Sequence, residues 1–175
     1  VSSPGNSTEA ITVANYNGRE RWFSSYNGGN DSVPTSTQGF EGIVDSSNEG
    51  PRLDGVLKPE IAASGSMVVS SRSADAPIID DDLPLIADNA QYRAMNGTSM
   101  ASPGVAGATA LLLQAKPNLT AKEVKELLTT SAFKDIATGT TANAKWGHGK
   151  LNIYEAVSKT LLPIKSDFEA LSIDD

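Results

Sequence analysis

The feature of this sequence that most constrains its fold is a glycine-flanked turn that runs directly into an apolar helix, at residues 95–107 (MNGTSMASPGVAG). A serine at such a junction is held on a tight bend. The unpaired amides of the first helical turn and the positive end of the helix dipole favour negative charge beside it. Ser99 is therefore a candidate nucleophile. The alternative is that Thr98 or Ser99 only caps the helix.

The helix that follows is expected over residues 99–114. Pro103 is tolerated if it lies in the first turn, where amides have no intrahelical acceptor. Residues 105–113 are apolar nearly all round, which predicts a helix covered on several sides. Gly104 and Gly107 would let neighbouring backbone come close to it.

Two further helices are predicted downstream. Thr120 and Glu123 form a capping box that opens a helix running to Ser131, with Val124, Leu127 and Leu128 as its buried stripe. A glycine-rich turn at residues 146–152 precedes a short helix at residues 153–160.

Short strands are expected at residues 10–16, 22–26, 56–64 and 67–71, because β-branched and aromatic residues gather there. Residues 27–55 are rich in Gly, Ser, Asn, Asp and Pro, which indicates a long loop. The acidic residues within 73–89 lack the alternating spacing of a loop-type calcium site, so we interpret that segment as a solvated loop.

Composition narrows the function classes. The 175 residues suffice for one domain, and the absence of cysteine excludes disulfides, thiolate metal sites and a cysteine nucleophile. A net charge of −7 argues against a nucleic-acid partner. No apolar stretch is long enough to span a membrane. The chain begins with Val1 rather than Met, and we expect it to be a piece of something longer.

The heptapeptide GTSMASP at residues 97–103 closely resembles the active-site serine motif of the subtilisin-like serine peptidases. Other segments resemble the same family in the same order, namely 3–5 with 10–13, 23–25 (FSS), 58–65 (KPEIAASG) and 146–152 (WGHGKLN). The resemblance covers about residues 1–160. It implies an α/β, three-layer fold with a mostly parallel sheet, of which residues 1–161 form the C-terminal portion of the catalytic domain. Residues 162–175 are then a tail or linker.

The resemblance also implies a chemistry. Ser99 would attack peptide bonds and form an acyl-enzyme, with peptides or proteins as substrates. The family's catalytic Asp and His and its oxyanion-hole Asn precede the segment where this chain begins, so we expect the N-terminal part of the same enzyme as a partner. Secretion is expected. The substrate-binding residues implied by the matching segments are Ser2, Ser3, Pro4, Asn96, Gly97 and Thr98.

The family's chemistry requires no cofactor, but many members carry a structural calcium or monovalent cation. Its counterpart here would be the carboxylate of Glu60 with the backbone carbonyls of Gly5, Ser7 and Ala10. Two departures from the family pattern are Ser64, where proline is usual, and Gly104, where a non-catalytic histidine is usual.

Three alternatives remain on the sequence. His148 is the only histidine, but it lies between two glycines in a segment that the resemblance marks as structural, so we expect no catalytic role. An α/β-hydrolase esterase would need glycine where Ala101 stands. A catalytically inactive homologue that binds peptides or a partner is the runner-up hypothesis.

Overall fold

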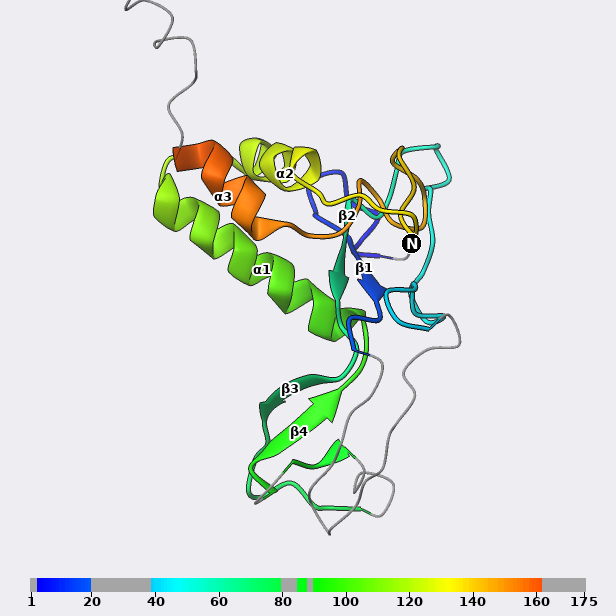
Figure 1. The fold of residues 1–175 in the computed structure, drawn as a ribbon, viewed down its shortest axis with the longest axis vertical. Coiled ribbons are helices and arrows are strands. Elements are labelled where there is room, and N and C mark those ends of the chain that lie inside the picture. Colours follow the sequence, from blue (N-terminus) through cyan, green and yellow to red (C-terminus); the bar gives the residue numbers. More distant parts are fainter. Residues whose placement is uncertain (1–2, 20–38, 80–84, 88–89, 162–175) are drawn as a thin grey trace, which may run out of the picture.

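The computed structural model describes residues 3–19, 39–79, 85–87 and 90–161 (Figure 1). The predicted strand at 22–26, Ser2 and the tail 162–175 lie outside these ranges. In chain order the elements are β1 (Val13–Tyr16), β2 (Ile61–Ser64), β3 (Val68–Ser71), β4 (Tyr92–Met95), α1 (Thr98–Ala115), α2 (Ala121–Thr130) and α3 (Ile153–Leu161).

The sheet that carries the core is parallel. β1 pairs with β2 in parallel register, with Val13 opposite Ile61. Residues 149–151 run in the same direction along the other edge of β2, because Ala62 donates to the Gly149 carbonyl at 2.9 Å and accepts from the Leu151 amide at 2.8 Å. β1 and β2 are shorter than predicted. For β2, one physical reason is that Pro59 has no amide to offer a strand ladder.

The side chains of these strands alternate between two hydrophobic clusters. Val13, Ile61 and Ala63 pack against the helices, whereas Ala14 and Ala62 pack against Ile43 and Trp146. In Figure 1 the three helices lie on one side of β1 and β2. The described residues thus have the predicted α/β class and parallel sheet, with helices over one face of that sheet.

Only one face of α1 is buried by the described residues. Ala101, Val105, Ala108 and Leu112 form that face. On the rest of the helix, Leu111 and Leu113 are 49% and 38% exposed. The sequence predicts cover on several sides of this helix, and the described residues supply it on one side only. The predicted close approach at Gly104 and Gly107 is not found among the described residues, since nothing lies within 4 Å of a Cβ built at either.

The helix boundaries otherwise follow the sequence. α2 begins with the predicted capping box, in which Thr120 accepts from the Glu123 amide and the Glu123 side chain accepts from the Thr120 amide. Pro103 was expected in the first turn of α1. It lies further along, inside the helix. Its missing amide leaves the carbonyl of Ser99 without the usual intrahelical donor.

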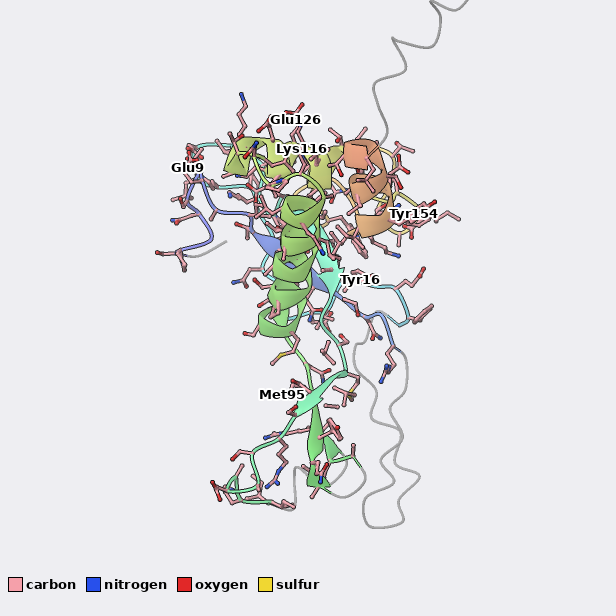
Figure 2. All side chains as sticks on the ribbon, turned by 90° about the vertical axis from the view of Figure 1, so that its left-hand side faces the viewer. Glu9, Tyr16, Met95, Lys116, Glu126 and Tyr154 are labelled. Atoms are coloured by element: carbon pink, nitrogen blue, oxygen red, sulfur yellow. The ribbon has the colours of Figure 1, made fainter. Side chains whose placement is uncertain are left out.

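An antiparallel pair, β3 with β4, projects away from the helices and the parallel strands (Figure 1). In Figure 2, Met95, the last residue of β4, lies at the end of this pair that is nearest to α1. The sequence did not predict β4, because Tyr92–Met95 carries neither β-branched residues nor a clear alternation. Among the described residues, no helix combines the length and apolarity needed to cross a membrane.

Candidate active site

Ser99 is the second residue of α1, and it is exposed. The N-cap is Gly97, with φ 143° and no side-chain cap hydrogen bond. Thr98 and Ser99 are therefore inside the helix, and the hypothesis that either one serves as its cap is wrong. The Ser99 amide belongs to the first helical turn, where backbone donors have no intrahelical acceptor. Such a donor can serve an anion held beside the serine hydroxyl.

Backbone hydrogen bonds tie the Ser99 turn to the parallel sheet. Gly97 donates to the carbonyl of Gly65 at 2.9 Å, and Gly65 donates to the carbonyl of Tyr16 at 3.4 Å. The side chain of Asn96 accepts from the amide of Met67 at 2.5 Å. The ends of β1 and β2 thus position the N-terminus of α1.

Gly65 sits at the centre of this junction. A Cβ there would lie 2.4 Å from the Gly97 carbonyl oxygen, 2.6 Å from Asn15 Oδ1 and 2.8 Å from the Ala101 amide nitrogen. Only glycine fits so close to the turn. Neither Gly65 nor Asn15, which is fully buried, is a site residue that the sequence predicts. The signal was present in the segment KPEIAASG, whose last residue is Gly65.

A pocket of about 200 Å³ lies beside Thr98, the neighbour of Ser99. It is lined by Ser3, Pro4, Gly5, Thr12, Val13, Ser46, Asn48 and Thr98. The structure therefore brings together three of the predicted substrate-binding residues: Ser3, Pro4 and Thr98. Asn96 and Gly97 are not among the residues that line this pocket; they precede α1, with Gly97 as its N-cap. Ser46 and Asn48 were missed because they lie in the segment interpreted as a long loop.

His148 lies at the other end of the sheet from Ser99. Its amide donates to the Glu60 carbonyl at 2.9 Å, beside the start of β2, whereas Ser99 follows the Gly65 contact beyond the end of β2. Four strand residues at about 3.3 Å each separate these ends by about 13 Å, so the imidazole is out of hydrogen-bond reach. Burial, with the nearby charge of Lys134, lowers the pKa of His148. A neutral, half-buried imidazole agrees with the structural role predicted for it.

Most of the oxygen atoms of the predicted cation site already accept hydrogen bonds from other groups of the protein. Glu60 and the carbonyl of Ala10 lie together, but each accepts hydrogen bonds from the ammonium groups of Lys58 and Lys125. The Gly5 carbonyl accepts from the Thr12 hydroxyl, and the Ser7 amide donates to the Pro4 carbonyl. Across the described ranges, no three side chains of the His, Cys, Asp or Glu type converge on a possible metal position.

Comparison with known proteins agrees with this geometry. The chain is 37% identical over 137 residues to the serine protease AprX of Bacillus subtilis (strain 168), which covers 77% of this chain and 28% of AprX. It is 38% identical over 93 residues to the minor extracellular protease Vpr of the same organism, covering 53% of this chain and 10% of Vpr. The chain therefore spans less than a third of these relatives.

Solved structures share the fold. Fervidolysin from Fervidobacterium pennivorans, a keratinolytic enzyme related to subtilisin, matches with a TM-score of 0.59 and 24% identity, over 94% of this chain and 21% of that one. The CspB protease of Clostridium perfringens matches with a TM-score of 0.63 and 20% identity, over 93% of this chain and 29% of that one. The family model of the subtilase family matches residues 1–149. With its serine at the start of α1 and a parallel sheet behind it, the chain belongs to the subtilase family.

Proposed function

We propose that this chain is the nucleophile-bearing part of a subtilisin-like serine endopeptidase. The observation that carries the proposal is the position of Ser99, which is exposed in the first turn of α1 and follows a pocket-lining residue, Thr98. A peptide whose side chain entered that pocket would bring its carbonyl carbon near the serine hydroxyl. The pocket and Ser99 could therefore act on the same peptide, the pocket by binding a side chain and Ser99 by attacking the adjacent carbonyl carbon.

The reaction proposed is acyl transfer. Ser99 Oγ attacks the carbonyl carbon of the peptide bond while a histidine of the N-terminal part takes its proton and later gives it to the leaving amine. The Ser99 amide donates to the oxyanion, together with an asparagine side chain of the N-terminal part. Water then hydrolyses the acyl-enzyme, with the same histidine as base. The chemistry requires no metal or organic cofactor.

The exposed side of α1 supports the proposal that the N-terminal part of the enzyme packs against this chain. Leu111 and Leu113 are exposed, although both are large and apolar. A hollow of about 310 Å³ lies between the strand side of α1 and the start of the sheet, lined by Ile11, Val13, Ser102, Val105, Ala106 and Thr109. We propose that the N-terminal part of the same enzyme packs against this surface. Burying it would stabilise the fold by about 25 cal/mol per Å² of apolar surface.

The pocket wall also favours a class of substrate. Its lining side chains are hydroxyls, one amide and small apolar groups, and none of the eight carries a charge. A charged side chain would lose its hydration there without gaining a counter-charge. We therefore propose that the residue bound in this pocket is uncharged. Secretion is proposed as well, since one relative is named an extracellular protease.

The test is labelling with a fluorophosphonate probe, which reacts with activated serines. The 175-residue chain alone is expected to remain unlabelled, and the chain produced together with its N-terminal part is expected to label at Ser99. Ser99→Ala should abolish labelling. Ser71→Ala, at an exposed serine of β3, should retain it. Failure of the completed protein to label, with the fold intact, would favour the peptide-binding homologue instead.

Folding offers a second measurement. If the N-terminal part is required, the isolated 18.3 kDa chain should not melt cooperatively and should not elute as a single species in size-exclusion chromatography. A monodisperse chain with a sharp melting transition would contradict the proposed partner. It would leave the role of Ser99 to be decided by the labelling experiment.

A further inference from the structure

Lys58 is a lysine with almost no exposure, at 1% of its surface. Its ammonium group donates to Glu60 Oε1 at 2.6 Å and to the Ala10 carbonyl at 2.8 Å. The other carboxylate oxygen of Glu60 accepts from the Thr12 amide at 2.7 Å. A buried ammonium requires such acceptors, because an unpaired charge in the interior is costly.

Lys125 reaches the same oxygens from α2. Its ammonium group lies 2.8 Å from the Thr8 carbonyl, 3.1 Å from the Ala10 carbonyl and 3.2 Å from Glu60 Oε1. Lys125 is thus the link between α2, the turn at residues 5–10 and the residue that precedes β2. Two ammonium groups share one carboxylate and one carbonyl.

Two of these acceptors, Glu60 and the Ala10 carbonyl, belong to the predicted cation site, and a metal ion does not fit there as the side chains stand. Calcium requires six to eight oxygen ligands at 2.3–2.6 Å. Here Glu60 Oε1 and the Ala10 carbonyl point at nitrogen atoms, at distances typical of N–H···O hydrogen bonds. The cluster already holds two positive charges against one carboxylate, so a further cation would be repelled.

We propose that the ammonium groups of Lys58 and Lys125 take the place of the metal ion that the sequence pattern predicts at Glu60. The chain's own side chains then supply the positive charge, and Glu60 binds neither calcium nor a monovalent cation. The turn they hold begins with Gly5, which lines the pocket beside Thr98. The pocket wall is therefore positioned without a metal, whether or not the protein is a peptidase.

Metal stoichiometry tests the proposal on the whole protein. After equilibration with calcium or potassium and removal of free ions, inductively coupled plasma mass spectrometry counts the bound metal. Wild type and Glu60→Gln should bind the same number of equivalents, because any metal would be held elsewhere. One additional equivalent of either ion in the wild type would overturn the proposal.

A second variant covers the case in which Glu60→Gln does not fold. With a chelator present, Lys125→Met should lower the melting temperature by about 2–8 °C relative to Lys122→Met, because of these two lysines Lys125 is the one that donates to the carbonyls of the turn. Lys122 is an exposed lysine of the same helix and a matched control. Equal melting temperatures would overturn the proposal. Neither measurement depends on peptidase activity, so the result is independent of the function proposed above.

Discussion

Gly97, the N-cap of the helix that carries Ser99, donates its amide to the carbonyl of Gly65 at 2.9 Å. This hydrogen bond joins the end of β2 to the turn before the nucleophile. It also brings the two backbones so close that a side chain on Gly65 would overlap the Gly97 carbonyl. The position of Ser99 is thus set by backbone packing between two glycines.

Gly65→Ala should displace the Ser99 turn. A Cβ at 2.4 Å from a backbone oxygen forces a shift, and we expect a loss of about 1–3 kcal/mol in the free energy of unfolding, with weaker fluorophosphonate labelling. Denaturant titration and labelling of the completed protein check this. Gly104→Ala is the matched control, since its Cβ meets nothing within 4 Å and alanine favours the helix by up to about 1 kcal/mol. Equal effects of the two variants would contradict the packing argument.

His148→Gln should leave labelling of Ser99 unchanged and alter the pH dependence of stability. Burial lowers the pKa of His148 in the folded state, so the unfolded chain binds the proton more readily. The stability linked to the neutral imidazole is present above the unfolded pKa of about 6.5 and is lost as the pH falls toward the folded pKa. Melting curves from pH 7.5 to 5, about the range that brackets this window, should show a flatter profile in the variant. Loss of labelling would instead indicate a catalytic histidine.

Lys150→Met should destabilise the protein by about 1–3 kcal/mol. The Lys150 ammonium is buried, donates to Asp135 Oδ2 at 2.6 Å, and lies over the Tyr16 and Trp146 rings at 5.2 and 5.4 Å. Its removal deprives Asp135 of its hydrogen-bonded counter-charge. Lys145→Met, at an exposed ion pair with Glu49, should cost less than about 1 kcal/mol. Chemical denaturation of both variants in the completed protein decides whether burial sets the difference.

The Asp135 carboxylate should also make the stability of the protein depend on pH in the acid range. The hydrogen bond from Lys150 holds the pKa of this carboxyl below its ordinary value. Its contribution to stability is therefore present above about pH 4, the unfolded pKa, and is lost as the pH falls through the folded pKa. Asp135→Asn should be less stable than wild type at neutral pH, and the gap should narrow in acid. A gap that stays constant down to the acid transition would contradict this.

Asn48→Asp should change which peptides are cleaved. Asn48 lines an otherwise uncharged pocket, and a carboxylate there would attract a basic substrate side chain. We expect kcat/KM for peptides with Lys or Arg at that position to rise about tenfold, corresponding to about 1.4 kcal/mol, relative to uncharged residues. Asn6→Asp, which lines a different hollow, is the control. Hydrolysis of a peptide panel by the completed enzyme measures the ratio.

Local sequence was enough to predict several elements. The capping box at Thr120 and Glu123 and the turn into the Ser99 helix depend on hydrogen bonds and backbone angles within a few residues, so both could be inferred without the fold. The parallel arrangement came from the family resemblance, whose matching segments include parts of both β1 and β2. The pocket residues Ser3, Pro4 and Thr98 came from the same resemblance, and the structure places them together.

Other features were decided only by contacts between distant segments. β4 has little strand preference of its own, and it exists because β3 lies beside it. The role of Gly65 depends on how closely Gly97 and Ala101 approach it. The surroundings of Glu60 depend on Lys125, which lies on a helix 65 residues away along the chain. No local pattern encodes these distances, because long-range packing sets them when the strands and helices assemble.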